Sequence, residues 1–154
     1  MLYLSLTIEL YDVQVNLFRC KILFKSSTVF NLNNLMISNS NTKLVERLIS
    51  QAIITSERVA EAMRRVDRGD FVLEKSLAYE DCPLSIGYNA TISAPHMHAY
   101  CLGWLESVLQ PGAKVLDVGS GSGYLCAVFN EMTRSKVVGI EHIPELVEIS
   151  KENL

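Results

Sequence analysis

The sequence has no dense block of basic residues. Its 14 Lys and Arg are outnumbered by 17 Asp and Glu, which gives a net charge of −3 at pH 7. Because nucleic-acid phosphates are bound by clustered Lys and Arg, this balance excludes a broad nucleic-acid surface, and we expect no nucleic-acid partner. With 49% hydrophobic and 20% charged residues, the composition also excludes a disordered or fibrous chain. The length of 154 residues predicts about one domain.

The cysteines lack a metal-binding pattern. Cys20, Cys82, Cys101 and Cys126 are widely separated, form no CxxC pair, and have no neighbouring histidine at ligand spacing. This spacing predicts reduced thiols in an intracellular protein and no metal site.

The chain also lacks an uninterrupted hydrophobic run of membrane-spanning length. Residues 1–35 are poor in charge, with five charged residues, and they help to raise the mean hydropathy to +0.19. A spanning helix needs ~20 mostly apolar residues, and here Glu9 and Asp12 interrupt the segment. Its basic residues follow the apolar stretch, which is the reverse of a secretory signal. We therefore expect no membrane partner.

This apolar N-terminal segment alternates instead. Apolar residues occupy every second position from Leu2 to Leu10 and again from Val13 to Leu17, and a period of two predicts a β-strand. The alternative is a poorly specified extension that is not native sequence. Because Met36 opens a more ordinary sequence, it is a hypothetical native start, which endogenous protein with residues before Met36 would contradict. We divide the chain into an atypical extension, 1–35, and a domain, 36–154.

Three amphipathic helices are predicted between Met36 and Pro111. Asn41 or Thr42 is placed to cap the first, Thr55 or Ser56 the second, and Ser93 the third, while 67–92 is expected to form loops. The apolar stripes expected in the core are Leu44, Val45, Leu48 and Ile49; Val59, Ala60, Met63 and Val66; and Met97, Cys101, Trp104, Leu105 and Val108.

The remaining chain alternates strands and helices. A buried strand over 113–118, a glycine loop over 119–123, a helix over 124–132, a strand over 136–140 and a helix from Pro144 are predicted. Parallel strands require such helical crossovers, so the fold class is α/β with a Rossmann-like sheet. The fold is expected to be incomplete: N-terminal helices plus the first βαβα of the parallel sheet. Its unpaired edge is one that the alternating N-terminal run could join.

The glycine loop points to a nucleoside-type ligand. Asp117 precedes Gly119, Gly121 and Gly123. The G-x-G-x-x-G spacing of dinucleotide sites is not met, because the residue three positions after Gly121 is Tyr124. Glu141 follows Gly119 by 22 residues, at the end of the next strand. In nucleoside-binding sheets an acid at this place accepts hydrogen bonds from ribose hydroxyls. The alternative is a tight structural turn without a ligand.

Two segments resemble a known family. The D-x-G-x-G-x-G pattern resembles motif I of the class I S-adenosylmethionine-dependent methyltransferases. Residues 86–99, which read IGYNATISAPHMHA, closely resemble the signature of the protein-L-isoaspartate (D-aspartate) O-methyltransferase family. Segments within 62–84 and 138–147 also resemble this family, in the same order along the chain. The resemblance therefore covers about residues 40–154. It implies a class I methyltransferase fold that is C-terminally truncated in this chain.

The resemblance implies transfer of a methyl group from S-adenosyl-L-methionine to the α-carboxylate of L-isoaspartyl residues in damaged proteins. Isoaspartyl-containing proteins and peptides would be the partners of a cytoplasmic, monomeric repair enzyme. A carboxylate is already ionised at neutral pH, so catalysis would rest on alignment, with Ser93 as the catalytic residue. The implied cofactor-binding residues are Ala90, Thr91, Ile92, Ser93, His98, Asp117, Gly119, Gly121, Ser122, Glu141 and His142.

Other interpretations stay open. From the residues alone, Ser93 can simply cap a helix, and His96 and His98 can be ordinary structural histidines. The chain can also be a class I methyltransferase with another substrate. Because the later strands, with their adenine contacts, are expected after the helix begun by Pro144, a non-catalytic fragment is the remaining alternative.

Overall fold

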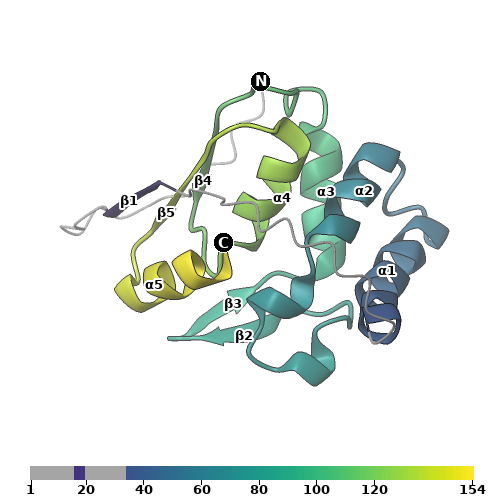
Figure 1. Ribbon diagram of the computed structural model, residues 1–154, viewed down its shortest axis with the longest axis horizontal. Helices are drawn as coiled ribbons and strands as arrows, with labels where there is room; N and C mark the ends of the chain where they lie inside the picture. Colours follow the sequence, from purple (N-terminus) through teal and green to yellow (C-terminus); the bar gives the residue numbers. More distant parts are fainter. Residues whose placement is uncertain (1–15, 20–33) are drawn as a thin grey trace.

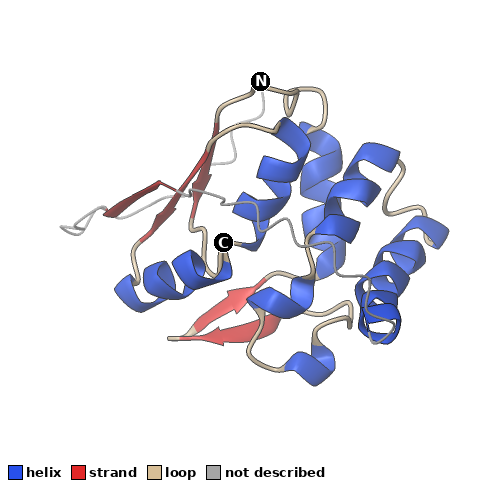
Figure 2. Cartoon of the chain, viewed as in Figure 1, coloured by secondary structure: helices blue, strands red, loops and turns tan. Residues whose placement is uncertain are grey.

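The structure is a computed structural model that describes residues 16–19 and 34–154. After one short strand come helices and a hairpin, and strands and helices then alternate (Figures 1 and 2). They are β1 Asn16–Arg19, α1 Asn34–Ser50, α2 Glu57–Arg65, η1 Arg68–Phe71, η2 Lys75–Leu77, β2 Leu84–Gly87, β3 Ala90–Ile92, α3 Pro95–Leu105, β4 Val115–Val118, α4 Tyr124–Thr133, β5 Val137–Glu141 and α5 Pro144–Asn153.

A three-stranded sheet with the order β1-β5-β4 confirms the α/β class. β4 and β5 are parallel, with Val115 opposite Val137, and α4 forms the crossover between them. β1 pairs antiparallel with β5, with Leu17 opposite Ile140. A strand at the end of the N-terminal run thus joins a sheet edge, although it overlaps the predicted alternating stretch only at Asn16 and Leu17; the rest of that stretch lies outside the described residues.

The first helix differs from the prediction in where it begins. α1 starts at Asn34, so neither Asn41 nor Thr42 caps it. Asn41 is instead buried, and its amide donates to the backbone carbonyls of Met63, Arg64 and Val66 at 3.0, 3.2 and 3.2 Å. Asparagine favours helix N-termini, but here Asn41 hydrogen-bonds the free carbonyl groups at the C-terminal end of α2.

The prediction for α2 is confirmed at Ser56. This residue is the N-cap, and its side chain accepts a hydrogen bond from the backbone N–H of Val59 at 3.4 Å. That contact satisfies one of the backbone donors that the first turn leaves unpaired.

Two predictions for α3 are wrong. Ala94, not Ser93, is the N-cap, because Pro95 already occupies the first helical position. The buried face consists of Pro95, His98, Ala99 and Leu102, whereas Trp104 is 77% exposed. Apolar residues lie on almost every side of α3, so the helical period in the sequence fits more than one buried face.

The segment expected to be loops contains a hairpin. β2 and β3 pair antiparallel, joined by Tyr88 and Asn89 with φ of +52° and +58°. Positive φ at both central residues is typical of a type I′ turn. The strands have four and three residues, too few for a clear alternation in the sequence. The hairpin brings Thr91–Ser93 to the start of α3.

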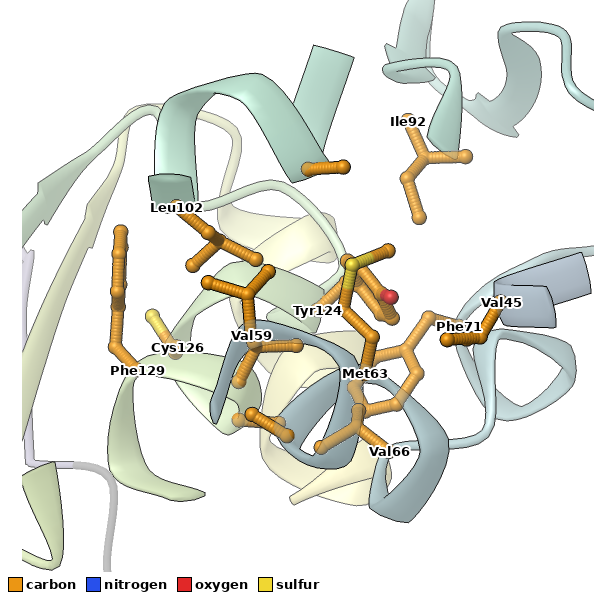
Figure 3. Close-up of a cluster of buried hydrophobic side chains, with 14 of the residues drawn as sticks. Val45, Val59, Met63, Val66, Phe71, Ile92, Leu102, Tyr124, Cys126 and Phe129 are labelled. Carbon is orange, nitrogen blue, oxygen red and sulfur yellow. The ribbon is translucent and has the colours of Figure 1, made fainter. Parts of the chain in front are cut away.

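The hydrophobic core lies between α4 and the N-terminal helices. Figure 3 shows Val59 and Met63 of α2 together with Leu102 of α3, Tyr124 and Phe129. All five side chains are at most 6% exposed. In Figure 1, α4 lies nearest to β4 and β5, with α3, α2 and α1 farther from the sheet.

The opposite face of β4 is exposed. Leu116 and Val118 of β4 are 57% and 63% exposed, so the expectation of a buried strand over 113–118 is wrong for this face. No helix within residues 34–154 is long and apolar enough to cross a membrane.

Candidate nucleoside-binding site

The glycine loop is held against the end of β5. Gly119, Gly121 and Gly123 have φ of +81°, +53° and +90°, a region in which side chains with a Cβ are strained. The N–H groups of Gly119 and Ser120 donate to the carbonyl of Ile140 at 2.8 and 3.1 Å. These bonds fix the path of the chain between β4 and α4.

Glu141, the last residue of β5, is buried beside this loop. Its Oε2 accepts from the N–H of Gly121 at 2.9 Å, and its Oε1 accepts from the N–H groups of His142 and Ile143 at 2.8 and 3.1 Å. The His142 side chain is exposed, with Nδ1 3.0 Å from Glu141 Oε1. The two predicted features, the glycine loop and the acid, are therefore in direct contact.

Gly139 is a residue that the sequence analysis missed. A Cβ there would lie 2.9 Å from Ser120 Cβ and 3.0 Å from Cys126 Sγ, closer than such atoms normally approach. The absence of a side chain thus lets both the loop and α4 approach the sheet. A glycine inside a strand was the available signal, because it marks a close approach of neighbouring backbone.

A pocket of about 100 Å³ lies between the hairpin, α3 and the glycine loop. It brings together most of the predicted site residues: Thr91, Ile92, Ser93, His98, Asp117, Gly119, Gly121 and Ser122. Ala90, Glu141 and His142 do not line it. Ile86, Ser120, Tyr124 and Leu125 line it without having been predicted; Tyr124 carried a signal as the first helical residue after the loop.

His98 lines this pocket and has a buried, unpaired nitrogen. The side chain is 6% exposed, and within the described part of the chain Nδ1 has no hydrogen-bond partner. Its ring lies 4.9 Å from the ring of Tyr124, centroid to centroid. Burial, the Arg68 guanidinium and His96 lower the pKa of His98 to about 3. The imidazole is thus neutral at physiological pH, and its Nδ1 is left without a partner among the described residues.

Asp117 gives the pocket an acidic wall. Burial and the nearby Glu141 carboxylate raise its pKa, while a hydrogen bond from Cys126 Sγ to Oδ2 at 3.5 Å opposes that shift. The residues that line the pocket include no Lys or Arg. A wall that holds the carboxyl group of Asp117 and no Lys or Arg suits a ligand that carries positive charge better than a phosphate.

Comparison with known proteins agrees with this geometry. The family model for protein-L-isoaspartate(D-aspartate) O-methyltransferase matches residues 39–154. Protein-L-isoaspartate O-methyltransferase 1 of Arabidopsis thaliana is 58% identical over 118 residues, which are 75% of this chain and 51% of that protein. The Caenorhabditis elegans relative is 50% identical over 118 residues, 75% and 52% of the two chains.

A solved structure is similar as well. The crystal structure from Plasmodium falciparum, described as a protein-L-isoaspartate O-methyltransferase in complex with S-adenosyl-L-homocysteine, is 41% identical. It matches with a TM-score of 0.71 over 75% of this chain and 55% of that one.

The fold is that of an α/β protein, with a candidate nucleoside-type site at the carboxyl ends of its parallel strands. The chain belongs to the protein-L-isoaspartate O-methyltransferase family. It spans about half the length of the curated relatives that it matches. Among residues 34–154, no group of three His, Cys, Asp or Glu side chains is placed to hold a metal ion.

Proposed function

We propose that the chain carries the S-adenosylmethionine-binding half of a protein-L-isoaspartate O-methyltransferase. The observation that carries this proposal is the contact between Glu141 and the Gly121 amide beside the pocket. In this contact the carboxylate that we propose as the ribose acceptor lies next to a loop whose glycines allow a ligand to approach the backbone. The relative from Plasmodium falciparum, described with S-adenosyl-L-homocysteine, supports the choice of ligand.

The residues present fit the cofactor. Glu141 would accept hydrogen bonds from the ribose hydroxyls, Asp117 would attract the ammonium group, and the neutral His98 offers its unpaired Nδ1. Thr91 and Ile92 would cover the ligand from the hairpin side, as would the neighbouring Ala90. The remaining predicted contacts are Gly119, Gly121, Ser122 and His142. When bound, the cofactor supplies an activated methyl group on a sulfonium.

Ser93 is proposed to hold the substrate carboxylate. It is exposed and lines the pocket, where a hydroxyl donor can orient an α-carboxylate of an isoaspartyl residue without competing as a nucleophile. Since that carboxylate is ionised at neutral pH, the chain needs no strong general base. Positioning then supplies the catalysis, for which ~7–11 kcal/mol is available.

Calorimetric titration of the 154-residue chain with S-adenosylhomocysteine tests the binding half of this proposal. We expect a one-to-one complex, and at least a tenfold weaker one for Glu141→Gln, which loses about 1.4 kcal/mol or more of charged hydrogen bonding. Glu148→Gln, an exposed carboxylate on α5, serves as the matched control and should bind as wild type does. Equal affinity of wild type and Glu141→Gln would contradict the assignment.

Transfer of a labelled methyl group tests the catalytic half. An isoaspartyl peptide should be methylated in preference to the matched aspartyl peptide by about fivefold or more, which corresponds to ~1 kcal/mol. Ser93→Ala should slow turnover more than it weakens binding of S-adenosylhomocysteine. Equal use of both peptides would point to another substrate.

One observation favours a second candidate, a chain that binds the cofactor weakly and does not turn over. The pocket of about 100 Å³ is smaller than the ~300–1,000 Å³ typical of small-molecule sites. Binding of S-adenosylhomocysteine without any methyl transfer would select this candidate.

Two broader features belong to the same proposal. The methyltransferase domain comprises residues 36–154, and residues 1–35 are an extension; the family match that begins at residue 39 supports this division. We also propose a cytoplasmic monomer that acts on isoaspartyl-containing proteins and peptides.

A further inference from the structure

Arg68 is a buried charge that the proposed function does not use. Its side chain is 0% exposed and belongs to η1, shortly after α2. Its Nη2 donates to the backbone carbonyl of Cys82 at 3.3 Å, whereas Nε and Nη1 have no hydrogen-bond partner within the described part of the chain. A buried charge that is incompletely hydrogen-bonded costs free energy. This cost makes Arg68 a candidate for a functional role.

No carboxylate among residues 34–154 forms an ion pair with Arg68. Asp81, whose charge acts on the pKa of Arg68, is paired with another residue. Its Oδ1 accepts a hydrogen bond from the backbone N–H of His96 at 2.9 Å and lies 2.9 Å from His96 Nδ1. Burial lowers the pKa of Arg68, but a guanidinium stays protonated in proteins at neutral pH. Arg68 is therefore a positive charge that no neighbouring carboxylate cancels.

This charge lies behind one wall of the candidate pocket. The Cζ of Arg68 is 5.9 Å from the centroid of the Tyr124 ring, and that ring is 4.9 Å from the ring of His98. Tyr124 and His98 line the pocket, whereas Arg68 does not. Phe71 packs edge-on against the Tyr124 ring at 5.4 Å between centroids, which helps to hold it in place (Figure 3). Arg68 can thus act on the pocket without touching a ligand.

The charges that act on the pocket differ from wall to wall. Beside the glycine loop, burial and the Glu141 carboxylate raise the pKa of Asp117. On α3, burial, Arg68 and His96 lower the pKa of His98. Negative charge is therefore felt at Asp117 and positive charge at His98. A ligand that carries both an ammonium and a carboxylate group would be oriented by this difference, because charges interact more strongly in a protein interior than in water.

We propose that Arg68 is a positioning residue of the candidate site. From behind Tyr124, its charge draws the carboxylate of the cofactor's amino-acid part to the His98 wall, while Asp117 attracts the ammonium group. This inference rests on the proposed function, because it assumes a ligand of the S-adenosylmethionine type. It assigns a role to a residue that contacts neither the ligand nor the substrate.

Arg68→Met tests the proposal, because it removes the charge and keeps a side chain of similar length. Calorimetry compares S-adenosylhomocysteine with its decarboxylated analogue, a primary amine that lacks only the carboxylate. We expect the variant to bind S-adenosylhomocysteine about fivefold or more weakly than wild type, and the analogue less than about twofold more weakly. A purely structural role of Arg68 would weaken both ligands by the same factor.

Arg58→Met is the matched control. It removes the same kind of charge from α2, where Nη2 of Arg58 donates to the carbonyls of Glu106 and Leu109 and the residue does not line the pocket. The ratio of the two affinities should stay as in wild type. Circular dichroism checks that both variants are folded.

Wild type alone supplies a test that does not depend on the folding of a variant. It should bind S-adenosylhomocysteine more tightly than the decarboxylated analogue. Equal affinity of wild type for the two ligands, or an equal loss of both in Arg68→Met, would overturn the role of Arg68 and leave the proposed function standing. Absence of binding of S-adenosylhomocysteine to wild type would contradict the proposed function, and this inference with it.

Discussion

At the scale of single residues, His98 links stability to pH. Its pKa is about 3 in the folded chain and near 6.5 in the ordinary imidazole. Between pH 3 and pH 6.5, the imidazole of His98 is therefore protonated in the unfolded state and neutral in the folded state. Stability is fully present above pH 6.5 and is lost as the pH falls toward 3.

We predict that His98→Asn reduces this loss. Between pH 6 and 4, the difference in unfolding free energy between wild type and variant should change by about 1.4 kcal/mol per pH unit. Urea unfolding at several pH values measures it. Leu102→Ala, a nearby core change without a titrating group, should lower stability with no change in slope. Parallel profiles for wild type and His98→Asn would count against a neutral His98.

Asn41 gives a second prediction at this scale. Asn41→Ala leaves three carbonyls without their donor, in two buried contacts and one part-buried contact, and we expect a loss of about 2–3 kcal/mol in unfolding free energy. Gln51→Ala, which removes an exposed amide just after α1, should change stability by less than about 0.5 kcal/mol. Equal effects of the two would show that the buried contacts of Asn41 contribute nothing.

At the scale of elements, the approach of the glycine loop and α4 to β5 depends on Gly139. A Cβ there meets Ser120 and Cys126 at 2.9 and 3.0 Å, and the loop is also bonded to Ile140 and Glu141. Strain at one strand position is therefore transmitted to the proposed ribose site.

We predict that Gly139→Ala costs about 1–3 kcal/mol in stability and weakens binding of S-adenosylhomocysteine. Gly103→Ala is the matched control, because a Cβ there, in the last turn of α3, meets nothing within 4 Å. It should stabilise the chain by about 0.5–1 kcal/mol. Chemical unfolding and calorimetry measure both effects; wild-type binding by Gly139→Ala would argue against the coupling of strand and site.

α3 shows what spacing can and cannot predict about an element. Its existence was predictable, but its apolar residues surround the helix, so several stripes satisfy the same period. The exposed Trp104 and the buried His98 reverse the usual preference of these residue types. The choice follows from other parts of the chain: the ring of Tyr124 lies against His98, and the charge of Arg68 helps to lower the pKa of His98.

At the scale of the whole molecule, the site couples three segments that are distant in sequence: the hairpin with the start of α3, the glycine loop after β4, and the end of β5. A ligand that contacts all three binds only the folded chain and so stabilises all of it.

We predict that S-adenosylhomocysteine at 100 times its dissociation constant raises the unfolding free energy by about 2.7 kcal/mol. This corresponds to a rise of roughly 5–10 °C in the midpoint for a chain of this size. Scanning calorimetry measures the shift. Adenosine, which lacks the carboxylate and ammonium groups, is the control and should give a smaller rise; no shift with either ligand would argue against a site on this chain.

The sequence by itself determined the α/β class, the helix–strand order from Val115 onward and the candidate site residues. These depend on local signals: strand and helix periods, Pro144 at a helix start, and glycines that the loop requires. Tertiary structure alone decided the partners of Asn41, the buried face of α3, the close approach at Gly139 and the uncovered face of β4. Each of these depends on contacts between segments that are distant in the sequence. Local patterns of residues do not specify which distant segments come into contact.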